Sequence, residues 1–320
     1  MSLGEFDLIE KYFTRRVRRA ALGVGDDCAL FATSPGMQLA VSSDMLVEGR
    51  HFLPTVAPDR LGHKALAVNL SDLAACGARP IAFTLALAMP RVDEPFLAGF
   101  ARGLLALADA HECELIGGDT TQGPLNLCIT VFGELPTGEA LLRSGARSGD
   151  DLYVSGTLGD ARAALEVFRG SLAVDGAAFE SLRRAMEQPT PRVALGQALR
   201  GIATSAIDIS DGLLGDLGHV LRRSQVGATL AVDALPRGAV LRTLPMALQR
   251  EFTLAGGDDY ELLFSAPPDR VDAVAAAART AGVGVTRVGR IESEPGLRLV
   301  DANGAALANR YGSFDHFKSP

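Results

Sequence analysis

The stretch that decides the fold is residues 59–89, DRLGHKALAVNLSDLAACGARPIAFTLALAM. Apolar residues recur at helical spacing through its first part, and this pattern predicts a helix over residues 59–76. Gly77 follows the last helical turn and Pro80 lies just beyond it, so the helix is expected to end there. The apolar run 81–89 then predicts a buried strand. A helix that leads into a buried strand is typical of a mixed α/β protein.

Regular elements are predicted along the rest of the chain in the same way. Further helices are expected at residues 5–13, 94–112, 210–223 and 270–281. Further strands are expected at residues 28–31, 37–43, 115–116, 125–134, 152–154, 205–209, 228–232, 260–265, 285–291 and 297–300. The segment 135–151 is rich in glycine and proline, and we expect a domain boundary there. The predicted fold class is therefore α/β (α+β), with two mixed α/β domains at residues 1–140 and 141–320.

Composition narrows the function classes. Of the 320 residues, 48% are hydrophobic and 22% charged, which is ordinary for a globular protein and argues against disorder. The formal net charge of −7 argues against a general surface for nucleic acid or anionic membranes. No CxxC pair or zinc spacing occurs, so buried, reduced thiols are expected at Cys28, Cys76, Cys113 and Cys128. With no N-terminal leader pattern and no apolar run of membrane length, the sequence predicts a cytoplasmic protein without nucleic-acid or membrane partners.

Aspartates gather around short glycine motifs at the ends of the apolar runs. They include Asp26, Asp27, Asp44, Asp72, Asp119, Asp208, Asp211, Asp258 and Asp259. Two like charges about 4 Å apart repel by roughly 4 kcal/mol at an effective dielectric near 20, so a fold that gathers several carboxylates needs cations among them. Mg²⁺ prefers such oxygen ligands and usually binds phosphate as well.

Two of these sites lie in the first half of the chain. Ser42, Ser43 and Asp44 offer two hydroxyls and a carboxylate at the expected end of a strand, although a cap or turn would use the same residues. Asp72 interrupts the apolar helix, so it must face solvent or pair with a cation. Asn69 lies three residues before Asp72 and therefore shares its helix face.

Two further motifs point to phosphate, and a third places three carboxylates before a strand. The glycine pair in residues 117–121 (GGDTT) lets backbone N–H groups approach a phosphate. Residues 208–212 (DISDG) precede a helix whose free N–H groups favour an anion, although simple helix capping is the alternative. In residues 258–261, strand alternation would point Asp258 and Tyr260 to one face, and Asp259 and Glu261 to the other.

A few basic and aromatic side chains complete the candidate site. His51 follows Asp44 closely enough to line the same cleft, and Arg143 could neutralise a phosphate; either could equally be a solvated surface residue. The only lysines are Lys11, Lys64 and Lys318, and no P-loop motif is present, so lysine-based phosphate binding is not expected.

Taken in order, these segments resemble the thiamine-monophosphate kinase family, part of the superfamily that includes aminoimidazole ribonucleotide synthetase. The matching stretches cover nearly the whole chain. They are residues 4–6 (GEF), 25–30 (GDDCAL), 43–44 with 51–52, 64–75 (KALAVNLSDLAA), 117–121 (GGDTT), 143–145 (RSG), 206–213 (AIDISDGL), 256–262 (GGDDYEL) and 315–317 (DHF).

The resemblance implies ATP-dependent phosphorylation of thiamine monophosphate to thiamine diphosphate, by direct in-line transfer with several Mg²⁺ ions. It implies a homodimer whose N-terminal sheets pair into a barrel, with an N-terminal domain that binds ATP and metal. The C-terminal sheet, covered by helices, would complete the active site. The implied metal ligands are Asp27, Ser42, Ser43, Asp44, Asp72, Asp119, Asp208 and Asp211. The implied nucleotide contacts are Gly118, Asp119, Arg143, Ser210 and His111. Substrate contacts would be His51, Asp258 and Phe314, and no side chain is expected to act as a covalent or acid–base catalyst.

Three departures from the family pattern bear on these assignments. Ser43 replaces a common threonine and keeps the hydroxyl, and Asp258 replaces a frequent glutamate with a shorter arm. Phe314 keeps an aromatic ring but loses a polar group. Within the superfamily, a synthetase would use the same ATP machinery, whereas selenophosphate synthetase and the hydrogenase-maturation protein would need cysteines that this chain lacks. A non-catalytic nucleotide or metal sensor is the alternative of another class.

Overall fold

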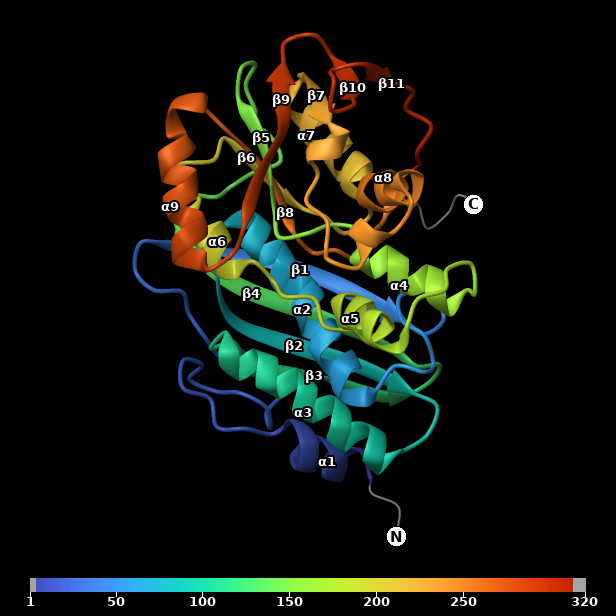
Figure 1. Cartoon of the computed structure of the whole chain (residues 1–320). Coiled ribbons are helices and arrows are strands. Elements are labelled where there is room, and N and C mark those ends of the chain that lie inside the picture. The colour runs from blue at the N-terminus through green and yellow to red at the C-terminus, as the bar shows by residue number, and fades with distance from the viewer. Residues whose placement is uncertain (1–3, 313–320) are drawn as a thin grey trace. The chain divides into compact units, whose positions relative to one another are not determined.

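The computed structural model describes residues 4–312 and divides into two compact units (Figure 1). Unit 1 comprises the chain up to Leu73 together with Ala78–Gly138. Unit 2 comprises Ala74–Gly77 and the chain from Glu139 onward. Each unit has a sheet and helices of its own, which confirms the predicted mixed α/β class.

Unit 1 is a four-stranded sheet with helices. Its strands are β1 (Met37–Val47), β2 (Arg79–Met89), β3 (Glu114–Gln122) and β4 (Asn126–Pro136). Its helices are α1 (Glu5–Leu8), the π-helix η1 (Ile9–Phe13), α2 (Pro58–Cys76) and α3 (Glu94–Ala110). The strand order is β1-β4-β2-β3, so β1 and β3 form the two edges. β4 pairs antiparallel with β1 and β2, whereas β2 and β3 are parallel.

The two faces of this sheet differ in composition. Alternate residues of β2 and β4, such as Phe83, Leu85 and Ile129, are buried. The helices α2 and α3 cover one face of this sheet (Figure 1). We call this the inner face. The outer face carries the intervening residues, and on β1 four of them are large and exposed: Leu39, Val41, Met45 and Val47.

Glycines allow α2 and α3 to approach closely. A Cβ at Gly62 of α2 would lie 2.1 Å from the carbonyl oxygen of Phe100, and one at Gly103 of α3 would lie 1.8 Å from that of Asp59. Any larger residue at either position would force the helix backbones apart. The helix pair therefore forms a rigid cover over the inner face, with one side of α2 facing β1.

Unit 2 contains a seven-stranded mixed sheet in the order β11-β10-β7-β9-β5-β8-β6. Its strands are β5 (Asp151–Ser155), β6 (Ser205–Asp208), β7 (Gly227–Ala231), β8 (Leu262–Ala266), β9 (Val285–Glu292), β10 (Gly296–Val300) and β11 (Ala306–Leu307). Its α-helices are α4 (Asp160–Phe168), α5 (Gly176–Glu187), α6 (Val193–Ala198), α7 (Leu213–Ser224), α8 (Met246–Ala255) and α9 (Val271–Ala281). Short 3-10 turns occur at η2 (Val232–Ala234), η3 (Leu241–Thr243) and η4 (Pro268–Arg270).

The core of unit 2 forms between α7 and the sheet. Leu217 and Val220 of α7 are buried in one cluster with Leu230 of β7 and Leu263 of β8. A second cluster joins α4, α5 and α8. The first cluster fixes the helix that follows β6, which is the segment where the sequence predicts phosphate contacts.

Several local predictions were wrong. Residues 28–31 do not form a strand, and only an isolated bridge at Leu30 is found there. The strand predicted at 37–43 runs on to Val47, so residues 42–44 lie inside β1, and residues 117–121 lie inside β3 rather than in a loop. The helix predicted at 210–223 begins at Leu213, because Gly212 has a φ of +109°.

The structure also bears on two expectations that were drawn from composition. The four cysteines are free, but only Cys113 is buried, and Cys28 is exposed. Within residues 4–312, no helix is both long and apolar enough to cross a membrane.

Candidate active site

An oxygen-rich cluster lies between β1 and α2 in unit 1. Because strand residues alternate, Ser42 and Asp44 both point to the inner face, toward α2. The Ser42 hydroxyl donates to the Asp72 carboxylate, and the backbone N–H of Asp44 donates to the side-chain oxygen of Asn69 over 3.0 Å. Asn69 is fully buried and its amide donates to the Ala65 carbonyl at 3.0 Å. The structure therefore brings Ser42, Asp44 and Asp72 together, and Asn69 and Asp72 share one helix face, as predicted.

Ser43 points the other way. Its hydroxyl lies 3.0 Å from the hydroxyl of Thr130 and 3.1 Å from the carbonyl oxygen of Ile129, on the outer face. The side-chain oxygen of Ser43 is thus separated from Ser42 and Asp44 by the sheet itself. Only the backbone of Ser43 is adjacent to the cluster.

His51 lies in the turn that leaves β1. Its Nδ1 accepts a hydrogen bond from the backbone N–H of Val47 at 2.9 Å, and its own N–H donates to the Val47 carbonyl at 3.0 Å. A neutral imidazole that accepts at Nδ1 carries its proton on Nε2. The Lys64 ammonium of α2 donates to the His51 carbonyl oxygen over 3.3 Å. Sequence reasoning missed this lysine, although a lysine within an apolar helical run is a signal of a buried partner.

Gly118 and Asp119 lie in the opposite edge strand, β3. A Cβ at Gly118 would lie 1.9 Å from the Leu85 carbonyl oxygen, and the φ of +152° also favours glycine. The register places Asp44, Ile129, Leu85 and Gly118 in one row across the sheet. Three strand spacings separate the ends of this row, or about 14 Å.

Asp119 also belongs to the other face. It pairs in register with Ala86, which is exposed on the outer face, and Asp119 itself is exposed. Asp44 and Asp119 therefore occupy opposite edges and opposite faces of one sheet. Within unit 1 the structure does not bring these two predicted ligands together.

The remaining predicted residues of unit 1 are dispersed. Asp27 is exposed in the segment before β1, where its N–H donates to the Asp26 carboxylate at 2.8 Å. His111 ends α3, where burial, and then the nearby His63, lower its pKa. Within residues 4–312, no group of three or more His, Cys, Asp or Glu side chains is arranged to hold a metal ion.

In unit 2, the loop between β6 and α7 holds the second set of predicted residues. Asp208 ends β6 and is 4% exposed, while Ser210 and Asp211 are half-buried in the loop. The Asp216 carboxylate accepts the backbone N–H groups of Ser210 and Asp211 at 3.1 and 3.2 Å. Two N–H groups that the sequence assigned to an anionic ligand are therefore occupied by a side chain from the helix.

Asp216 is itself perturbed by this position. Burial, and then the neighbouring Asp211 carboxylate, raise the pKa of Asp216 to about 7, against the lowering effect of the two N–H groups. The Arg143 guanidinium also acts to lower the pKa of Asp216, and the carbonyl oxygen of this exposed arginine accepts from the Ser224 hydroxyl at 3.3 Å, at the C-terminal end of α7.

Asp258 joins the same loop. Its N–H donates to the Ser210 carbonyl at 2.9 Å, and its carboxylate accepts from the Tyr260 hydroxyl at 3.1 Å. Asp259 instead accepts the Gly159 N–H at 2.9 Å, and burial raises its pKa well above the ordinary value. Glu261 binds Arg192 at 2.6 Å. The predicted association of Asp258 with Tyr260 is found, whereas Asp259 and Glu261 bind different partners; positive φ angles at Asp258 and Tyr260 show that the segment is not the predicted strand.

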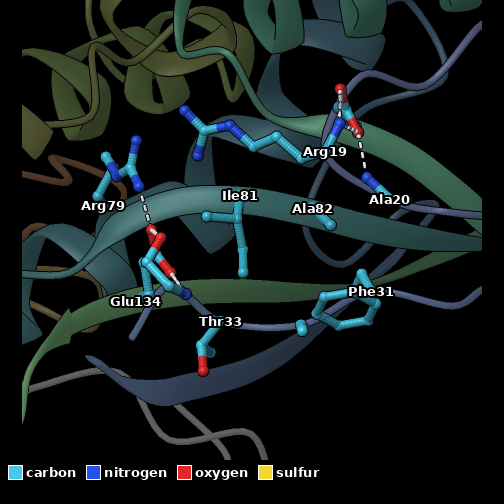
Figure 2. A pocket seen from close by; sticks show the side chains of 11 residues that line it. Arg19, Ala20, Phe31, Thr33, Arg79, Ile81, Ala82 and Glu134 are labelled. Carbon is cyan, nitrogen blue, oxygen red and sulfur yellow. Dashed lines mark hydrogen bonds and ion pairs between the residues drawn. The ribbon is translucent and has the colours of Figure 1, made fainter. Parts of the chain in front are cut away.

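A cavity of ≈ 330 Å³ lies in unit 1, and none of the site residues described above lines it (Figure 2). Its charged walls are already paired. Glu134 accepts the Ser34 N–H at 2.8 Å and binds Arg79, and these partners outweigh burial and lower the pKa of Glu134. Glu114 accepts N–H groups of residues 18–20 at 2.6–3.2 Å. The two carboxylates fasten the N-terminal segment to the sheet.

Phe314, predicted to contact substrate, lies outside the described residues.

Comparison with known proteins shows the family to which the chain belongs. Residues 25–135 match the model of the AIR synthase related protein N-terminal domain, and residues 147–302 match that of the C-terminal domain. The chain is 46% identical over 328 residues to the thiamine-monophosphate kinase of Salmonella typhimurium, and the match covers 100% of both.

Solved structures are similar over most of their length. The crystal structure of thiamine-monophosphate kinase from Stenotrophomonas maltophilia has a TM-score of 0.84 at 46% identity, covering 90% of this chain and 92% of that one. The structure of AaThiL complexed with AMPPCP and TMP has a TM-score of 0.78 at 29% identity, covering 89% of each chain. That relative thus binds an ATP analogue and TMP on the same fold.

Proposed function

Because the chain belongs to the thiamine-monophosphate kinase family of AIR synthase related proteins, we propose that it transfers the γ-phosphoryl group of ATP to thiamine monophosphate. The product is thiamine diphosphate, and the transfer is direct and in line. The observation that carries the proposal is the cluster of Ser42, Asp44 and Asp72, which offers only hard oxygen donors. A phosphate acceptor needs no strong base, because its oxygen is already nucleophilic when unprotonated.

The donor set fits Mg²⁺. Every side chain assigned to metal is a carboxylate or a hydroxyl, and Mg²⁺ prefers such oxygen ligands over nitrogen or sulfur. The residues that would hold the ions are Asp27, Ser42, Ser43, Asp44, Asp72, Asp119, Asp208 and Asp211. When bound, the ions would neutralise charge on the ATP and acceptor phosphates. Since the hydroxyl of Ser43 points to the outer face, its backbone oxygen is the better candidate ligand.

The chain's own groups hold the phosphates and the acceptor. The backbone of Gly118 is assigned to a nucleotide phosphate, and Arg143 is assigned as a positive charge for the phosphates. Ser210 contacts the nucleotide through its hydroxyl, because its N–H is bound to Asp216. His51 donates from Nε2 to the acceptor substrate, and Asp258 contacts the thiamine moiety. His111 is assigned to the adenine and Phe314 to thiamine.

A second copy of the chain covers the outer face. Leu39, Val41, Met45 and Val47 are 46%, 56%, 54% and 37% exposed along one edge strand, which is a large apolar surface for a monomer. Closing two such sheets into one barrel would bury these residues and leave no open edge. We therefore propose a homodimer in which the N-terminal domain dimerises.

The dimer would also bring together the two edge strands that carry Asp44 and Asp119. If the twofold axis runs along the barrel, β3 of one copy lies beside β1 of the other, whereas a perpendicular axis would pair β1 with β1. The first arrangement makes β3, which carries Asp119, the neighbour of β1 of the other copy, which carries Asp44, with the two side chains on opposite faces of the barrel wall. Each site would then draw on the β1 edge of one copy and the β3 edge of the other.

The deciding assay incubates the protein with ATP, Mg²⁺ and thiamine monophosphate, and measures thiamine diphosphate and ADP. Formation of both products in equal amounts supports the kinase. Nucleotide binding without either product would contradict the proposal and favour a non-catalytic sensor.

A further inference from the structure

Lys64 is a buried lysine that the proposed reaction does not use. It is 2% exposed on α2, and it is one of only three lysines in the chain. A buried ammonium is costly unless its donors are satisfied, so a fold retains one where it performs a specific task. Its Nζ reaches across to the turn after β1 and donates to the carbonyl oxygen of His51 over 3.3 Å.

That turn is closed by a compact set of hydrogen bonds. The Val47 carbonyl accepts the N–H groups of Arg50 and His51 at 3.1 and 3.0 Å, and the Gly49 N–H donates to Phe52 at 2.8 Å. The Val47 N–H then donates to Nδ1 of the His51 ring at 2.9 Å. The backbone contacts orient the imidazole, and the ring contact leaves the proton of its neutral form on Nε2.

We propose that Lys64 is a positioning residue: it fixes the turn of residues 47–52, so that neutral His51 presents Nε2–H to a hydrogen-bond acceptor on thiamine monophosphate. The inference rests on the proposed function, because it assigns His51 to that substrate. Lys64 itself touches neither substrate. Its loss therefore frees the turn and the ring, and weakens binding of the acceptor more than binding of ATP.

The test compares Lys64→Met with Lys64→Arg, which keeps a donor, and with Lys11→Met, which makes the same change at an exposed lysine paired with Glu94. Steady-state rates are measured with each substrate varied in turn. We expect Lys64→Met to raise KM for thiamine monophosphate about tenfold and KM for ATP by less than about twofold, as for loss of one oriented hydrogen bond. Lys64→Arg should recover most of the affinity, and Lys11→Met should match the wild type.

A second measurement does not depend on activity. Two-bond ¹H–¹⁵N spectra of the histidine rings, with His51 assigned by its loss in His51→Gln, report which nitrogen carries the proton. The wild type should show the Nε2–H form, and Lys64→Met a mixture of tautomers. If Lys64→Met does not fold, Lys64→Gln is measured in its place.

Equal changes in both KM values, or an unchanged tautomer in the variant, would overturn the proposal and leave Lys64 a packing residue. Failure of the proposed function would give a different experimental result. The wild type would then make no thiamine diphosphate, while the spectra would still report whether Lys64 orders the His51 ring.

Discussion

Mixed dimers of two inactive variants should recover activity if the site is shared between copies. Asp44 lies on edge strand β1 and Asp119 on edge strand β3 of the same sheet, three strands apart. Asp44→Asn and Asp119→Asn each remove a charge from the proposed metal site, and each alone should lower the rate by at least about a hundredfold. The fold should persist, because neither side chain belongs to the core.

The size of the recovery follows from the symmetry. In a mixed dimer, one site combines both altered residues, and the other combines the intact Asp44 of one chain with the intact Asp119 of the other. When equal amounts of the two variants pair at random, half of the dimers are mixed. Each mixed dimer has one working site out of two. The mixture should therefore show about a quarter of wild-type activity per chain.

The assay uses co-expressed chains with two different affinity tags, purified through both tags so that only mixed dimers remain. These should show about half of the wild-type rate. The matched control pairs Asp44→Asn with Asp72→Asn. Both residues face one another across β1 and α2 of the same chain, so each chain of that mixed dimer has a damaged set. No recovery is expected.

Two results would refute the reasoning. If the Asp44 and Asp119 variants fail to complement while remaining dimeric, the copies do not share a site in this way. In that case the axis that pairs β1 with β1 becomes the better model. If both variant pairs complement equally, Asp72 and Asp44 do not serve one metal site, and the assignment of the β1–α2 cluster is wrong.

Three further predictions concern backbone, stability and assembly. Gly118→Ala should lower kcat/KM for ATP at least about tenfold because its Cβ meets the Leu85 carbonyl at 1.9 Å, whereas Gly117→Ala, with 3.8 Å to Thr84, should stay within about twofold. Asp233→Asn should lower the free energy of unfolding by about 1–3 kcal/mol at pH 7 in urea titrations, because it loses the 2.7–2.8 Å bonds from Arg250. The Arg250 guanidinium holds the pKa of Asp233 below its usual 3.8, so this stabilisation is complete above pH 3.8. The difference in unfolding free energy between the variant and the wild type should vanish as the pH falls below that value. A difference that persists in acid would contradict the assignment. Val41→Glu should yield monomers in light scattering, whereas Val271→Glu, at a similarly exposed valine of α9, should not. If both variants remain dimeric, the outer face is not the dimer interface.

The sequence predicted those elements whose signals are local. The helix at residues 58–76 and the strand that follows it were recovered because periodicity, Gly77 and Pro80 act within one or two turns. The pairing of Asp258 with Tyr260 also followed from spacing alone, although the backbone there is not a strand.

The N-terminal segment was not predicted, because distant carboxylates order it. Glu114 binds the N–H groups of residues 18–20, and Glu134 binds Ser34, across separations of about 100 residues. Within residues 28–31, Leu30 bonds to residues 21 and 22 in an isolated bridge, so the apolar run there was a misleading signal. Likewise, the glycines of β3 suggested a loop, but pairing with β2 keeps them in the sheet.

The separation of the aspartates has an electrostatic reason. Two carboxylates about 4 Å apart repel by roughly 4 kcal/mol at an effective dielectric of 20, but at about 14 Å the repulsion falls to about 1 kcal/mol. A single copy that keeps Asp44 and Asp119 on opposite edges therefore folds without the full cost of gathering its carboxylates. Under the shared-site proposal, that cost arises only when two copies meet, and Mg²⁺ ions that also bind phosphate can offset it. Dimer assembly, metal binding and nucleotide binding would then stabilise one another, because each supplies the charge balance or the ligands that the others need.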